Sequence, residues 1–116
     1  MSTQLAFGRD SAGYNAYAPQ FASDNYSATL ANAAEEKITV PSNHAVWVAS
    51  FSYEPGANVW VAVNATAAIP AGGTFASTTS TLNPGARTVY AGDVLHLITD
   101  DTTADVGVTF YAISYP

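Results

Sequence analysis

Few side chains in this sequence have the chemistry of a catalyst. The two histidines, His44 and His96, are the natural general bases. With Ser42 or Ser50 as the nucleophile and Asp93 as the third member, a Ser-His-Asp triad can be drawn on paper. No nucleophile elbow accompanies these residues, and His96 lies in an apolar run that is typical of a buried or interface histidine. We therefore expect no enzymatic activity and no catalytic residue.

The sequence also offers few residues that could bind a metal or a cofactor. The chain has no cysteine, and its two histidines lack the neighbouring His and Glu ligands of a metal-binding cupin. Three carboxylates lie within residues 100–105 (DDTTAD), but this stretch lacks the glycine and the regular alternation of ligands found in dedicated calcium loops. We expect a solvated connection between strands there, the alternative being a calcium site completed by backbone carbonyls. The prediction is no metal and no cofactor.

The charge of the chain excludes several kinds of partner. Three basic residues stand against nine acidic ones, which gives a formal net charge of −6. A protein that neutralises phosphates needs clustered Lys and Arg, so nucleic acid and anionic membrane surfaces are not expected partners. The sequence has no apolar run of the ~20 residues that a membrane-spanning helix needs, and no signal peptide is visible. We therefore expect synthesis in the cytoplasm.

The surface of the protein should be unusually poor in charge. Charged residues make up 10% of the chain, against an average of about 25%. Since few charges would keep its faces apart in solution, we expect much of the outer surface to be covered by other protein. The alternative is a monomer with a surface rich in Ser and Thr.

Residues 1–26 differ in composition from the rest of the chain. They carry five aromatic side chains among Gly, Ala, Ser, Asn and Pro: Phe7, Tyr14, Tyr17, Phe21 and Tyr26. The spacing of these aromatics fits neither a strand nor a helix, so an irregular N-terminal arm is predicted. The arm should lie on its own domain or on a neighbouring subunit.

Residues 27–116 alternate short runs rich in Val, Ile, Thr and aromatics with turns that contain Pro or Gly. We predict strands at 27–31, 36–40, 45–53, 59–63, from 87 onward, 94–98 and 106–115. The last of these is apolar on both faces, which suits a central strand or one beneath an intersubunit contact. The predicted fold is all-β: a single β-sandwich of about eight strands, jelly-roll-like, because two packed sheets cover most strand edges.

Three aromatic residues outside the arm raise a different possibility. Trp60, Tyr111 and Tyr115 could form a flat platform on which sugar rings stack, as in carbohydrate-binding modules. The interpretation that we favour is that these rings pack in the sheet or against a neighbouring subunit.

Several short stretches between residues 28 and 113 recur in a known class of proteins. They are the strand end TVP (39–41), the turn PAGG (70–73) and the stretches PGAR (84–87) and AGDVL (91–95). With these features the chain resembles small structural proteins of tailed bacteriophages. The resemblance implies a non-enzymatic virion component of the decoration or cement type, which binds outside the capsid shell, stabilises it and is small, β-rich and oligomeric.

The same resemblance implies partners and a location. The partners are the major capsid protein and further copies of the chain, as a trimer or dimer. The location is the capsid exterior of the virion, after synthesis in the cytoplasm of the bacterial host. The alternatives are a tail or neck component of a phage particle and a carbohydrate-binding β-sandwich module.

Aromatic residues are the expected contacts in such an assembly. Those of the arm would bind the capsid, and the tyrosines of the last strand would pair subunits. The predicted contact residues are Tyr14, Tyr17, Phe21, Tyr26, Tyr111 and Tyr115.

Overall fold

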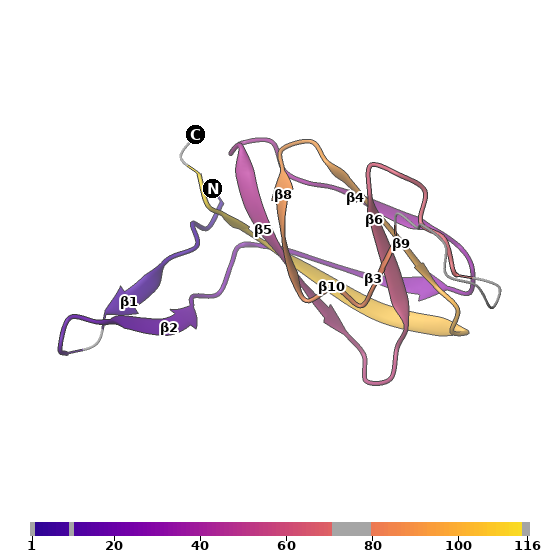
Figure 1. The fold of residues 1–116 in the computed structure, drawn as a ribbon, viewed down its shortest axis with the longest axis horizontal. Coiled ribbons are helices and arrows are strands. Elements are labelled where there is room, and N and C mark those ends of the chain that lie inside the picture. The colour runs from indigo at the N-terminus through magenta and orange to yellow at the C-terminus, as the bar shows by residue number, and fades with distance from the viewer. Residues whose placement is uncertain (1, 10, 71–79, 115–116) are drawn as a thin grey trace.

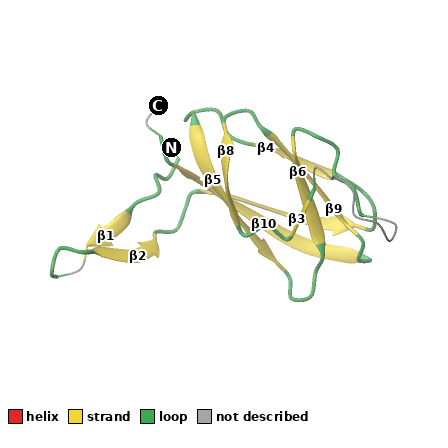
Figure 2. Cartoon of the chain, in the orientation of Figure 1, coloured by secondary structure: helices red, strands yellow, loops and turns green. Residues whose placement is uncertain are grey.

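The computed structural model describes residues 2–9, 11–70 and 80–114, and the regular elements within these ranges are all β-strands (Figure 1). Figure 2 shows them joined by loops and turns. In chain order the strands are β1 (Phe7–Arg9), β2 (Asn15–Pro19), β3 (Asp24–Ala31), β4 (Glu36–Thr39), β5 (Val46–Tyr53), β6 (Val59–Val63), β7 (Thr81–Leu82), β8 (Ala86–Tyr90), β9 (Val94–Thr99) and β10 (Thr103–Ala112). No helix among the described residues is long and apolar enough to cross a membrane.

Strands β3 to β10 form the predicted sandwich. One antiparallel sheet has the order β3-β10-β5-β8 and the other has the order β4-β9-β6-β7. The chain crosses between the sheets at each connection from β3 to β10 except the one from β6 to β7. Strands that are adjacent in sequence therefore mostly face each other across the core, which is the arrangement of a jelly roll. The predicted all-β, eight-stranded sandwich is confirmed.

The first sheet is built around β10. This strand pairs with β3 from Thr103 to Phe110 and with β5 from Val106 to Ala112. Because side chains alternate across a strand, its even-numbered residues all face the core. The buried residues of β10 are Ala104, Val106, Val108, Phe110 and Ala112. β10 is thus the central strand that its apolar composition indicated.

Two aromatic rings occupy the centre of the core. Trp47 and Phe110 are fully buried, and their rings meet edge to face with 6.4 Å between centroids. The indole N–H of Trp47 donates to the carbonyl oxygen of His44 at 3.0 Å. The one polar atom of this ring is therefore satisfied inside the core.

The boundaries of β10 differ from the predicted range 106–115. The strand begins earlier because the preceding turn is short: β9 ends at Thr99, whose hydroxyl oxygen accepts from the N–H of Asp101 at 3.1 Å, and the Asp101 carboxylate in turn accepts from the N–H of Asn58 at 3.0 Å. It ends earlier because the chain turns after Ala112, and the Ser114 hydroxyl oxygen accepts the N–H of Val46 at 3.0 Å. Side-chain hydrogen bonds thus replace the predicted ladder after Ala112, whereas at its other end the ladder with β3 is longer than predicted and begins at Thr103.

The N-terminal arm is more regular than predicted. β1 and β2 pair as an antiparallel hairpin with a register shift, and Figure 1 shows this hairpin projecting from one end of the sandwich. Its turn uses Gly13 at φ +87°, a conformation that glycine adopts without strain. The aromatic spacing did not indicate these strands because a hairpin that stands away from the core needs no alternation of apolar side chains. The strand predicted at 27–31 is longer in the structure, where β3 begins at Asp24.

Two asparagines in the left-handed region of backbone space hold the ends of β6. Asn83 has φ 45° and Asn64 has φ 56°. The Asn83 side chain accepts from the N–H of Val59 at 2.8 Å and donates to the carbonyl oxygen of Ala57 at 2.9 Å. Asn64 accepts from the N–H of Val94 at 2.9 Å. Asparagine suits both positions because it tolerates this backbone conformation and can bond to nearby backbone groups.

We predict that Asn83→Ala lowers the free energy of unfolding by roughly 2 kcal/mol, through two lost hydrogen bonds and a strained backbone angle. Asn83→Gly removes the same hydrogen bonds but relaxes the backbone, so its loss should be smaller. Equilibrium unfolding in urea, followed by tryptophan fluorescence, measures both variants. An Asn83→Ala variant as stable as the wild type would contradict the role assigned to this side chain.

Candidate functional site

The N-terminal arm is anchored by its backbone to the end of β10. The N–H of Leu5 donates to the carbonyl oxygen of Ala112, and the N–H of Ala112 donates to the carbonyl oxygen of Thr3, both at 2.8 Å. Gln4 and Ala112 form a parallel bridge between these bonds. The incoming side of the arm therefore continues the first sheet for a short distance before the hairpin begins.

The returning side of the arm is held at the same place by side chains. The N–H of Ser23 donates to the Thr3 hydroxyl oxygen at 2.9 Å. The Tyr111 hydroxyl donates to the carbonyl oxygen of Gln20, and the side chain of Gln20 donates to the carbonyl oxygen of Gln4. Both ends of the hairpin are thus fixed to the sandwich, which sets the direction in which it projects.

Two of the predicted contact residues on the arm are strongly exposed. Phe21 is 99% exposed and Tyr14 is 73% exposed. Phe21 follows the second strand of the hairpin, and Tyr14 lies just before that strand begins. Scattered exposed apolar side chains are common on protein surfaces, and here two large rings are exposed on the same N-terminal arm. Tyr17 lies within β2.

Two further predicted contact residues belong to the sandwich. Tyr26 lies in β3, 44% exposed, with its ring edge to face against Phe110 at 5.8 Å between centroids. Tyr111 lies on the outer face of β10, half-buried beneath the base of the arm. The structure therefore does not gather the predicted contacts into one patch. Tyr115 lies outside the described residues.

The residues of the hypothetical triad are engaged separately. His44 is buried, where its Nδ1 donates to the carbonyl oxygen of Ser114 at 2.9 Å and its ring packs edge to face on Trp47. His96 donates from Nδ1 to Glu35, at 3.1 Å. The Asp93 carboxylate accepts from the Asn64 side chain and from the N–H of Tyr90. These contacts hold loops and strands in place.

The structure does not assemble the platform for sugar rings. Trp60 lies on the outer face of the second sheet, packed beside Ala62, Ala67 and Ile98. Tyr111 lies on the outer face of the first sheet, so the two rings lie on opposite sides of the sandwich. One surface cannot use both of them.

The carboxylates within residues 100–105 form hydrogen bonds in different places. Asp101 closes the turn before β10, as described above. Asp105 lies in β10, where its carboxylate accepts from the Thr29 hydroxyl at 2.7 Å. Among the described residues, no three His, Asp or Glu side chains come close enough together to hold a metal ion.

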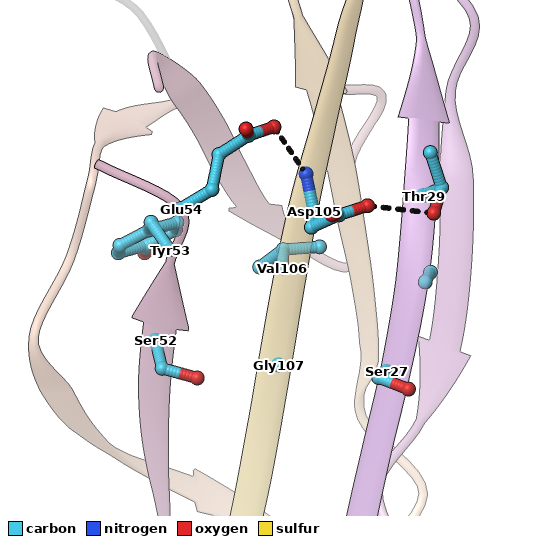
Figure 3. A pocket seen from close by; sticks show the side chains of 9 residues that line it. Ser27, Thr29, Ser52, Tyr53, Glu54, Asp105, Val106 and Gly107 are labelled. Carbon is cyan, nitrogen blue, oxygen red and sulfur yellow. Dashed lines mark hydrogen bonds between the residues drawn. The ribbon is translucent and has the colours of Figure 1, made fainter. Parts of the chain in front are cut away.

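A shallow groove of about 560 Å³ crosses the outer face of the first sheet (Figure 3). Its floor consists of Gly107 in β10 between Ser27 in β3 and Ser52 in β5, which are register neighbours. A Cβ on Gly107 would lie 2.7 Å from the Ser52 hydroxyl oxygen, so a larger residue here requires the Ser52 side chain to move. At one end the Glu54 carboxylate accepts from the N–H of Asp105 at 2.8 Å. The groove thus presents hydroxyl and backbone groups that can form hydrogen bonds with a polar surface.

A carboxylate holds a loop over the second sheet. Glu35 accepts from His96 at one oxygen (3.1 Å) and from the N–H of Ala67 at the other (2.8 Å), and Lys37 lies 3.9 Å away. The hydrogen bond from His96, and next the one from Ala67, hold the pKa of Glu35 below its ordinary value. Ala67 belongs to the residues that cover Ile98 and Trp60. Glu35 thus fixes the cover of this outer apolar cluster.

No protein-family model, curated protein or solved structure matches the chain. What indicates function is the chemistry of its own surface: a projecting hairpin with exposed rings, few charges and one long strand edge.

We predict that Glu35→Gln lowers the melting temperature at neutral pH. Because the pKa of Glu35 is lowered in the folded protein, its carboxylate stabilises the fold above the ordinary value of 4.5, and this contribution is lost as pH falls through the lower folded value. The difference between wild type and variant should therefore shrink in acid. Thermal melts from neutral to acidic pH measure it, with Glu36→Gln, at the neighbouring residue that begins β4, as the control. A difference that does not change with pH would rule out this role.

Proposed function

We propose that this protein is a non-enzymatic virion structural protein that decorates the outer surface of a bacteriophage capsid and stabilises the shell. The observation that carries the proposal is the N-terminal hairpin, which projects from the sandwich with Phe21 and Tyr14 exposed. The resemblance to small structural proteins of tailed phages supplies the class of partner, the major capsid protein. In this proposal the chain binds as a clamp, and the sandwich forms the outer body.

The chemistry of the arm suits a protein partner. Full burial of a large apolar side chain contributes about 1.5–3 kcal/mol before the cost of association. Phe21 is exposed enough to gain nearly all of this on binding. Because the base of the hairpin is fixed by hydrogen bonds to β10, less conformational freedom is lost when it docks.

Repetition makes a modest contact sufficient. A capsid offers many equivalent positions, so one arm per copy adds up to a large stabilisation of the shell. The low charge content agrees with a protein whose partners are protein surfaces rather than phosphates, since Lys and Arg number 3 in the chain. A tail or neck position would use the same contacts, and labelling of particles separates the two.

We predict that the double variant Tyr14→Ser, Phe21→Ser binds phage heads assembled without the protein at least roughly tenfold more weakly than the wild type. The control is Tyr90→Ser, which removes a ring of 57% exposure from β8. Co-sedimentation with heads measures binding, and circular dichroism confirms that both variants keep the β fold. Equal binding by the arm variant and the wild type would sink the clamp model.

A second experiment tests the place in the particle. Antibody against the chain, conjugated to gold, should label the heads of intact phage particles in electron micrographs. Label on the tail or neck alone, or on no part of the particle, would overturn the proposal.

A further inference from the structure

Among the residues that the structure describes, the sandwich has one strand edge that is long and unguarded. The four edge strands of the two sheets are β3, β8, β4 and β7. Natural edge strands are usually kept from pairing with other chains by shortness, charge, proline or a bulge. β7 has two residues, β8 carries Arg87, and β4 carries Glu36 and Lys37. β3 has eight residues, and from Asn25 to Ala31 it has neither charge nor proline.

The edge of β3 is also regular. Its register with β10 runs from Asp24 opposite Phe110 to Ala31 opposite Thr103 without a shift. Figure 1 shows β3 running away from the arm, so the hairpin leaves most of this strand uncovered. A straight ladder of this length is a template on which another strand can pair.

The direction of the free backbone groups follows from the ladder of β10. The carbonyl oxygen of Asp105 accepts from Glu54 on the β5 side. Since N–H and C=O groups alternate sides along a strand, the even-numbered residues of β10 bond toward β3. Their partners in β3 are also even-numbered, so Asn25, Ser27 and Thr29 direct their N–H and C=O groups to the open edge.

A second copy of the chain fits this edge. We propose that two copies pair antiparallel through β3, with the twofold axis at Ala28, so that the two first sheets become one continuous sheet. In this register Ser27 lies opposite Thr29 of the other copy, which joins outward donors to outward acceptors. Asn25 lies opposite Ala31, whose carbonyl oxygen also accepts from the N–H of Ala34 at 3.2 Å. Odd-numbered β3 residues of one copy must lie opposite odd-numbered β3 residues of the other, because only then do the core faces of the two sheets lie on the same side.

The side chains favour the axis at Ala28 over its neighbours. Ala28 meets its own counterpart there, and its small side chain suits the closest approach of two antiparallel strands. Tyr26 then lies opposite Leu30 of the other copy, on the core side. An axis at Ser27 would instead place the carboxylate of Asp24 opposite Leu30.

An apolar groove beside this edge gives the second copy something to cover. It has a volume of about 240 Å³ and lies between β3 and β4, where its lining includes Tyr26, Leu30, Ile38 and Leu97. The Tyr26 ring of a second copy, placed opposite Leu30, would cover this groove and bury its own exposed part. The pairing is therefore stabilised both by backbone hydrogen bonds and by the burial of apolar side chains. It stands independently of the proposed binding to capsids.

The first test is the mass of the wild-type chain in solution, by light scattering behind a sizing column. A dimer supports the proposal, whereas a monomer or a trimer overturns it, because antiparallel pairing of one edge makes twofold pairs only.

The second test places charge at the axis. Ala28→Lys sets two like charges opposite each other and should weaken the dimer by on the order of 100-fold. Ala28→Glu should do the same, and an equimolar mixture of the two variants should restore dimers as heterodimers. Thr88→Lys, an exposed residue on the β8 edge, is the matched control and should remain dimeric. Dimers that persist in Ala28→Lys, or a mixture that stays monomeric, contradict the interface.

The third test needs no substitution, so it stands even where a variant fails to fold. Amide hydrogen exchange of the wild-type dimer, resolved by residue, should show slow exchange at Ser27 and Thr29, as at their even-numbered neighbours. Fast exchange at these two amides in a dimeric sample would show that the copies pair elsewhere.

Discussion

The whole structure depends on the pairing of β10 along both of its edges. Its even-numbered residues bond toward β3 and its odd-numbered residues toward β5, while the even-numbered side chains fill the core. In the middle of the strand the Ser52 hydroxyl lies over Gly107, which has no side chain to meet it. Because β10 forms hydrogen bonds along both edges and packs one face into the core, it tolerates few substitutions. Binding surfaces that vary must therefore be formed by the elements around it.

Both proposed binding surfaces follow from the position of β10. Because β10 lies between β3 and β5, β3 is left at the edge of the sheet with half of its backbone groups directed outward. Because β10 ends at Ala112, its last backbone groups are open to Thr3 and Leu5, and this contact aims the hairpin away from the sandwich. Pairing through β3 and docking through the arm can therefore occur in the same molecule, with one arm on each copy.

Local patterns were sufficient to predict most of the sandwich. Alternating apolar residues and Pro- or Gly-containing turns indicated β5, β6 and β9 nearly to the residue, and the apolar character of both faces indicated that β10 is central. The jelly-roll order agrees with the expected class because two packed sheets are a common solution for chains of short strands. Two of the aromatics proposed as contact residues, Tyr14 and Phe21, are exposed in the structure.

Features that depend on distant pairings could not be predicted in this way. The contact of Glu35 with His96 joins residues far apart in sequence, and neither residue has a local pattern that names its partner. The same holds for Trp60 and Tyr111, whose separation on opposite faces depends on which strands share a sheet. The free edge of β3 is visible only once strand order is known. The hairpin of the arm escaped detection because no core face imposes a period on its side chains.

The central claim is that the projecting arm contacts the capsid shell. A photoreactive phenylalanine analogue at position 21 tests it most directly, on phage heads decorated with the protein and irradiated before mass spectrometry. We expect cross-links from position 21 to the major capsid protein, and none from the same analogue at position 90 on β8. Cross-links from position 21 to a tail or neck protein alone, or to the capsid protein from position 90 alone, would contradict it.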